Sequence, residues 1–361
     1  MHREVATLLA LALLLGLGCK RLGGQLAIPP DLGRGLTEID SLKALLSWLS
    51  EQSSPQADTL RIQVLYELTK KLRYEAPDTA MRLAQELEKA AQRSSYTAAR
   101  GLTYLAYGEA WLGKARHDSA LDYGWAALRF FTGSEPRYQT HAHIFLAELY
   151  GRLGRYDSLE THARQAIAVA EAIKQKALVA AGHVALGVAS YQRGEYEKSL
   201  EHYQKALAIQ EEIRDKRGVM GTYNKIGLVH YARGQYVEAL AYYQNSLEIA
   251  KQVGDRVNTA VNFNYIGTIH YTHGRYPEAL STHQEALKIW EQIGNKSGLA
   301  VSYTNIGNIY IEQRQYLKAL EAYQKAMDIF KQLGDQRGMA TSYNNIGNVY
   351  SNQGRYSEAL I

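Results

Sequence analysis

The chain has 361 residues, of which 46% are hydrophobic, and its 41 basic and 36 acidic side chains give a formal net charge of +5. Because both signs are mixed along the sequence, the charges are typical of solvated faces and argue against a basic stripe that binds nucleic acid. A single cysteine excludes a disulfide within the chain.

Residues 1–19 have the features of an export signal. A short charged start precedes an apolar run from Val5, and this run is shorter than the roughly 20 residues that a membrane span needs. Cys19 ends the run and follows Gly18, which resembles a bacterial lipoprotein signal whose cysteine is lipidated. We therefore expect an exported, membrane-associated protein rather than a cytoplasmic one. Because a positive charge at Lys20 tends to stay cytoplasmic, a cleaved signal and an uncleaved anchor remain as alternatives.

Residues 20–58 are predicted to form a tether and a capping helix. Glycine and proline mark the tether up to residue 35. A short amphipathic helix is predicted over Thr37–Ser50, where it would cover the open end of a repeat array. Pro55 marks a second predicted linker over Ser53–Asp58.

Residues 59–176 contain six stretches with helical spacing, which we interpret as three diverged hairpins. The predicted pairs are Leu60–Arg73 with Pro77–Arg93, Thr97–Leu112 with His117–Phe131, and Gln139–Leu153 with Tyr156–Ile173. The second helix of each pair opens on a similar acidic sequence. We predict that Asp78, Asp118 and Asp157 cap these helices.

Residues 177–361 repeat with a period of 40 residues, and the last copy is incomplete. A fixed period of this length indicates a stacked-repeat architecture. In the copy at Gly221–Arg256, apolar residues follow helical spacing twice, on either side of Gly234. Glycine suits a tight turn because it tolerates positive φ. We therefore predict an all-α fold, an α-solenoid of stacked antiparallel helical hairpins.

Three registers of the repeat predict how the hairpins pack. Mid-helix glycine costs roughly 1 kcal/mol against alanine, so its recurrence implies close approach of the partner helix. Small residues are predicted to face it, and tyrosines to fill the gap between successive hairpins. The glycines are Gly187, Gly227, Gly267, Gly307 and Gly347; the small residues are Ser199, Ala239, Ala279, Ala319 and Ala359; the tyrosines are Tyr196, Tyr236, Tyr276, Tyr316 and Tyr356.

This pattern resembles the tetratricopeptide repeat, from about Leu60 to Ile361. The matching residues of one copy are Ile226, Gly227, Gly234, Tyr236, Ala239, Tyr243 and Ser246. A bulky aromatic such as Tyr223 replaces the early tryptophan of the family, and Gly-Asp replaces its helix-ending proline. With the 40-residue period, these departures resemble the longer-helix variant found in polarity adaptors and bacterial signalling proteins. The resemblance implies a right-handed superhelix with a concave ligand groove.

The resemblance also indicates which side chains line that groove. One row of the first helices is Asn224, Asn264, Thr304 and Asn344, and the next turn gives Leu228, Thr268, Asn308 and Asn348. Asparagine is a poor helix former, but its amide offers both a donor and an acceptor. These polar side chains are therefore predicted to hold an extended peptide backbone, as in the variant that the chain resembles. The alternative is that they are ordinary solvated residues.

No stretch of the sequence indicates catalysis. The chain lacks a phosphate loop, a Gly-rich dinucleotide turn and a cysteine pair for a metal. His230 and His270 share a register that Tyr310 and Tyr350 occupy in later copies, which indicates packing rather than metal ligation. We predict no catalytic residue, no metal and no small-molecule cofactor.

The leading functional prediction is a non-catalytic scaffold at a membrane surface, which holds a protein or peptide segment in its groove. The alternative is the sensor region of a signalling protein of histidine kinase or nucleotide cyclase type, with its catalytic domain beyond Ile361. Tyr356–Ile361 matches the start of a second helix, so we expect the natural chain to continue.

Overall fold

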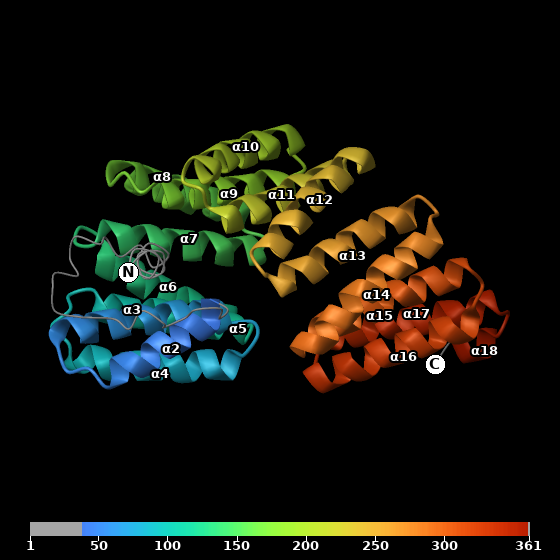
Figure 1. The fold of residues 1–361 in the computed structure, drawn as a ribbon, viewed down its shortest axis with the longest axis horizontal. Coiled ribbons are helices and arrows are strands. Elements are labelled where there is room, and N and C mark those ends of the chain that lie inside the picture. Colours follow the sequence, from blue (N-terminus) through green and yellow to red (C-terminus); the bar gives the residue numbers. More distant parts are fainter. Residues whose placement is uncertain (1–37, 360–361) are drawn as a thin grey trace. The chain divides into compact units, whose positions relative to one another are not determined.

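The computed structural model describes residues 38–359, and over these residues it contains helices and no strand (Figure 1). The predicted all-α solenoid of antiparallel hairpins is confirmed. The predicted signal, Cys19 and the tether lie outside the described residues. The helices are α2 (Glu38–Ser50), α3 (Pro55–Leu72), α4 (Pro77–Arg93), α5 (Ala99–Gly113), α6 (His117–Phe131), α7 (Pro136–Arg152), α8 (Tyr156–Ala172), α9 (Lys176–Gln192), α10 (Tyr196–Glu212), α11 (Lys216–Ala232), α12 (Tyr236–Gln252), α13 (Arg256–Thr272), α14 (Tyr276–Ile293), α15 (Lys296–Glu312), α16 (Tyr316–Leu333), α17 (Gln336–Asn352) and α18 (Tyr356–Ala359).

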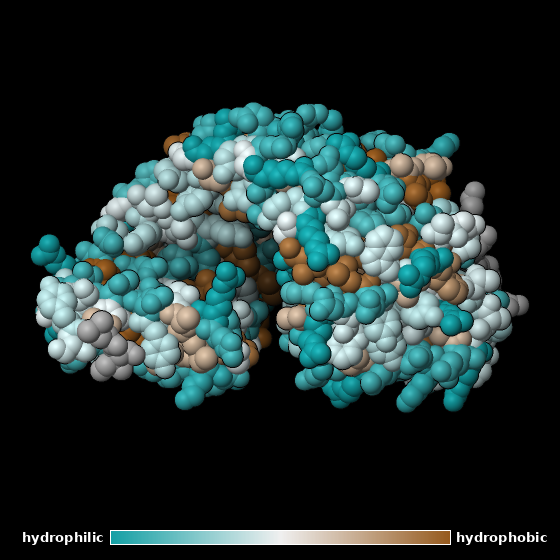
Figure 2. All heavy atoms as spheres, turned by 180° about the vertical axis from the view of Figure 1, so that it is seen from behind, coloured by the Kyte–Doolittle hydropathy of each residue, from teal (hydrophilic) through white to brown (hydrophobic). Residues whose placement is uncertain are grey.

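The chain divides into two compact units, Met1–Ile209 and Gln210–Ile361, and the division falls inside α10. In both units, helices that follow one another in sequence pack together. Consecutive antiparallel pairs such as α7 with α8, or α13 with α14, are the hairpins that the periodicity predicts. Hydrophilic residues cover most of the face that Figure 2 draws, with smaller hydrophobic areas between them.

In the first unit, α2 packs on the first hairpin. Leu45 and Leu49 of α2 are buried in one cluster with Leu60 and Val64 of α3. This contact supplies α3 with the apolar neighbour that a preceding repeat would otherwise provide, as a capping helix does.

The start of α3 differs from the prediction. Ser54 is its N-cap and accepts a hydrogen bond from the backbone amide of Ala57 at 3.1 Å, and Pro55 is the first helical residue. Proline is well placed there because its missing N–H would have had no partner in the helix. Most of the predicted linker Ser53–Asp58 is therefore helical.

The predicted caps of the second helices in the first unit are wrong. Asp78, Asp118 and Asp157 are each the second residue of their helix, after the N-caps Ala76, Arg116 and Arg155. A carboxylate in the first turn still interacts favourably with the helix dipole. Asp78 and Asp157 also form ion pairs with the next hairpin, to Lys114 and Arg193 respectively.

In the second unit, side-chain caps start the first helix of each hairpin. The cap accepts a hydrogen bond from the backbone amide three residues later, at 2.8–3.0 Å, which satisfies a donor that the helix leaves free. The capping residues are Asp215, Asp255, Asn295 and Asp335. The turn between the two helices needs a left-handed residue, which is Gly234 at φ +73° and Gly274 at φ +69°. Arg314 takes that conformation in the next hairpin at φ +56°.

The mid-helix glycines make room for a ring from the second helix of the same hairpin. A Cβ atom on Gly227 would lie 2.7 Å from the ring of Tyr243, and one on Gly267 would lie 2.7 Å from the ring of His283. This is the close approach that the repeated glycine predicted. Between hairpins, Tyr236 packs edge-on against His273, the C-cap of α13, with ring centroids 5.2 Å apart.

Candidate functional site

The predicted groove residues lie on the first helices of the hairpins in the second unit. Asn224 is on α11, Asn264 and Thr268 on α13, Thr304 and Asn308 on α15, and Asn344 and Asn348 on α17. The repeat places them at two registers one helical turn apart. Their surroundings, however, differ from helix to helix.

Asn264 is tied into the hairpin packing. Its Oδ1 accepts hydrogen bonds from Nδ1 of His283 at 3.0 Å and from Oγ of Ser302 at 3.2 Å. These bonds join α13 to α14 and to α15. The carbonyl side of this amide therefore has a structural role, and its amino group is the part left for other contacts.

The two threonines bond to their own helices. Thr268 donates its hydroxyl proton to the carbonyl of Asn264, and Thr304 donates to the carbonyl of Ala300, each at 2.9 Å. Such a bond to the helix backbone uses the only hydrogen-bond donor of the hydroxyl group. Its oxygen can still accept a hydrogen bond from a ligand. Asn224 differs from both, because its Oδ1 is buried and has no hydrogen-bond partner among residues 38–359. A buried unpaired acceptor of this kind costs about 1–3 kcal/mol.

Asn308 and Asn348 line one cavity of about 290 Å³, whose other walls come from α13, α15 and α17 and from Tyr323 of the second helix α16. Oδ1 of Asn308 accepts a hydrogen bond from the hydroxyl of Tyr323 at 2.7 Å. Asn348 is exposed, as is Asn344 one turn before it. Neither side chain forms a hydrogen bond within the described part of the chain, in which the second helix of this hairpin, α18, covers only Tyr356–Ala359. The full lining is Tyr271, Asn308, Ile311, Glu312, Tyr323, Asn345, Asn348, Ser351 and Asn352.

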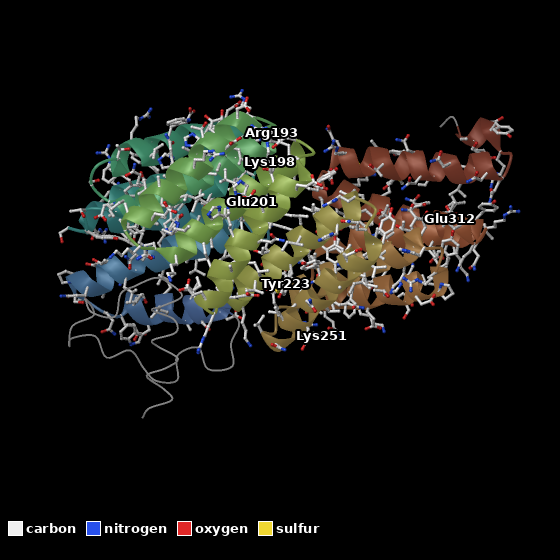
Figure 3. All side chains as sticks on the ribbon, turned by 90° about the horizontal axis from the view of Figure 1, so that it is seen from above. Arg193, Lys198, Glu201, Tyr223, Lys251 and Glu312 are labelled. Carbon is white, nitrogen blue, oxygen red and sulfur yellow. The ribbon has the colours of Figure 1, made fainter. Side chains whose placement is uncertain are left out.

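The cavity also contains residues that the sequence analysis missed. Asn345 and Asn352 add two amides from α17, and Glu312 adds a carboxylate from α15. Figure 3 labels Glu312 near the C-terminal end of the chain. The run from Asn344 to Asn352 is dense in asparagine. That density could have indicated from the sequence that Asn345 and Asn352 belong to the same site.

A second cavity, of about 190 Å³, lies in the first unit and is lined by charged side chains. Figure 3 labels two of them, Arg193 and Lys198. Arg193 pairs with Glu160 and Asp157. The charges on this cavity wall thus largely compensate one another.

Four histidines of the first unit form two pairs, each between the two helices of a hairpin. Nδ1 of His143 lies 3.0 Å from Nδ1 of His162, and the same atoms of His183 and His202 are 3.4 Å apart. Burial, and then the neighbouring His162, lower the pKa of His143 to about 4. Among residues 38–359, no group of three or more histidine, cysteine or acidic side chains could hold a metal ion. No helix in the same range is long and apolar enough to cross a membrane.

A family model described as tetratricopeptide repeat matches residues 138–212, 218–292 and 298–361, together more than half of the chain. No curated protein matches the sequence.

Solved structures with the same fold include the apo form of the quorum sensor NprR from B. thuringiensis. It is 15% identical, with a TM-score of 0.61 over 88% of this chain and 89% of that chain. A Rap protein complexed with Competence and Sporulation Factor is 14% identical, with a TM-score of 0.57 over 88% and 98%. A signal transduction ATPase with a tetratricopeptide repeat sensor, from Pyrococcus horikoshii, is 15% identical, with a TM-score of 0.61 over 89% of this chain and 51% of that one. At these identities the similarity shows the fold alone.

Proposed function

Because the chain belongs to the tetratricopeptide repeat family, we propose that it is a non-catalytic scaffold that holds an extended peptide segment of a partner protein. The segment lies along the first helices of the second unit and contacts their amide and hydroxyl side chains. In this proposal the chain needs no cofactor or metal. The fold of the family supports a protein-interaction role, and the similar Rap protein was solved in complex with a factor.

The observation that carries the proposal is the cavity where Asn308, Asn345, Asn348 and Asn352 meet. An asparagine amide matches a peptide group, because it can donate to a backbone carbonyl and accept from a backbone N–H. Four such amides at one cavity therefore favour main-chain recognition. This mode of binding does not require one particular sequence of side chains.

A selection of random twelve-residue peptides on the immobilised full chain tests this proposal. Enriched peptides should bind the wild type at least about fivefold more tightly than a variant with Asn344→Ala and Asn348→Ala, because two or three hydrogen bonds of about 0.5–1.5 kcal/mol each are lost. Both side chains are exposed, so the variant should keep its fold. Asn264 and Asn308 are unsuitable for this test because they bond within the structure.

Asn245→Ala is the matched control, since Asn245 is exposed on the second helix α12. It should bind the same peptides as the wild type. Equal affinity of the wild type and the Asn344/Asn348 variant for every enriched peptide would show that the amides do not form the binding site.

We also propose that Cys19 attaches the chain to a membrane surface. The support is the apolar run that ends at this single cysteine. Cys19→Ser should release the protein to a soluble fraction or leave an unprocessed precursor, as measured by fractionation and intact mass. If membrane association and mass stay unchanged, the cysteine is not the anchor.

A further inference from the structure

The amide-lined cavity of the second unit has one charged side chain on its wall, that of Glu312. Glu312 is exposed. No basic side chain among the described residues forms an ion pair with it. The cavity therefore has a local negative charge, although the chain as a whole carries a formal net charge of +5.

Two tyrosines of the preceding hairpin hold the carboxylate of Glu312. The hydroxyl of Tyr271 donates to Oε1 at 3.2 Å, and the hydroxyl of Tyr276 lies within 3.4 Å of Oε2. Burial, and then the charge of Glu312, raise the pKa of Tyr271 to about 12. Both hydroxyls thus remain protonated donors at neutral pH, and the carboxylate has a fixed position at the cavity wall.

This bridge between hairpins does not require a charge. One hairpin earlier, the hydroxyl of Tyr231 lies 3.4 Å from Oγ1 of Thr272, which occupies the register of Glu312. A neutral side chain therefore makes the same contact. In the regular repeats the other residues at this register are Gln192, Ala232, Thr272 and Asn352, all uncharged. The charge of Glu312 thus exceeds what packing needs, and it occurs only where the cavity is.

We propose that this cavity binds the guanidinium group of an arginine in the peptide segment, an inference that rests on the proposed function. A guanidinium has five N–H donors and no acceptor, and it pairs with a carboxylate through two parallel hydrogen bonds. Glu312 supplies that carboxylate, and the amide oxygens of Asn345, Asn348 and Asn352 can accept the remaining donors. The volume of about 290 Å³ lies at the lower end of ligand sites, as suits a single side chain.

Citrulline tests the proposal because it has the shape of arginine without the charge. Peptides selected on the full chain should contain an arginine whose replacement by citrulline weakens binding to the wild type by at least about tenfold. On Glu312→Gln, the arginine and citrulline peptides should bind with equal affinity. Gln keeps an acceptor for Tyr271, so this variant should remain folded. Glu291→Gln removes an exposed carboxylate from α14 and should keep the wild-type preference.

The two proposals fail in different ways. Peptides that depend on Asn344 and Asn348 but bind equally well with citrulline would overturn the arginine site and leave the scaffold function intact. If Glu312→Gln weakens the binding of the arginine peptide and of the citrulline peptide by the same factor, the arginine site is also overturned. Glu312 would then act through packing. If no enriched peptide depends on Asn344 and Asn348, the proposed function fails and the arginine site fails with it.

Discussion

Asparagines that share a register in this repeat do not share a role. Asn264 holds three helices together through its carbonyl oxygen, whereas Asn344, two repeats later, is exposed and without a hydrogen bond among the described residues. In the hairpin of Asn264, His283 of the second helix reaches the amide, whereas the same register in the hairpin of Asn344 would fall after residue 361. A row of amides in a sequence can therefore include side chains that belong to the packing, as Asn264 does.

His283 gives a pH-dependent contribution to stability. Its side chain is 1% exposed, and burial, followed by the nearby His270, lowers its pKa to about 4. An unfolded histidine has a pKa of about 6.5, so below that pH the unfolded chain binds a proton that the folded chain does not. The stability that neutral His283 contributes is complete above pH 6.5 and is lost as the pH falls toward 4. From pH 7.5 to 5 the loss from this residue is about 2 kcal/mol.

His283→Tyr should remove this acid-dependent loss of stability, because tyrosine binds no proton in this pH range. A tyrosine fits the site, since Tyr203, Tyr243 and Tyr323 occupy the same register in other repeats. Urea unfolding followed by circular dichroism at pH 7.5 and 5 measures it. The variant should lose about 2 kcal/mol less than the wild type over this range. His273→Gln, which changes an exposed side chain, should behave as the wild type. The same acid loss in His283→Tyr and the wild type would refute the assignment.

At the scale of the hairpin, a mid-helix glycine and a facing ring set how closely two helices approach. Gly267→Leu would push a side chain into the buried ring of His283, where even a Cβ atom would lie 2.7 Å away. Overpacking of a core typically costs about 1–3 kcal/mol. Gly221, also inside a helix, has no atom within 4 Å of an added Cβ. Gly221→Leu should therefore be neutral or stabilise the chain by up to about 1 kcal/mol through helix propensity.

Thermal unfolding of the two leucine variants measures this contrast. The midpoint should fall for Gly267→Leu and stay level or rise for Gly221→Leu. A Gly267→Leu variant as stable as the wild type would show that the glycine does not serve close packing.

The hairpins could be predicted from the sequence because a 40-residue period repeats each packing register several times. Single, unrepeated features were harder to predict. The caps assigned to Asp78, Asp118 and Asp157 were misplaced by two residues from the true N-caps, because local sequence does not fix where the preceding turn closes. The bond from Tyr271 to Glu312 joins two hairpins. Its detection needs the geometry of stacking, which a pattern within one repeat does not contain.

At the scale of the whole molecule, the side chains at one register of the first helices have different surroundings in the two units. Glu148 lies two repeats before Leu228, in the row that continues to Asn308 and Asn348. It pairs with Arg73, which also pairs with the buried Glu109. In the first unit this row contains the ion-paired Glu148 and then Val188, whereas in the second it reaches Asn308 and Asn348 at the cavity. Ligand binding is accordingly expected in the second unit.

The most direct test of the scaffold is a crystal structure of the full chain bound to one selected peptide. An extended peptide should lie on the first helices of the second unit, with the side-chain amides of Asn344 and Asn348 about 2.7–3.2 Å from its backbone N–H and C=O groups. A peptide bound on the second helices, in the first unit, or only through its side chains would contradict it.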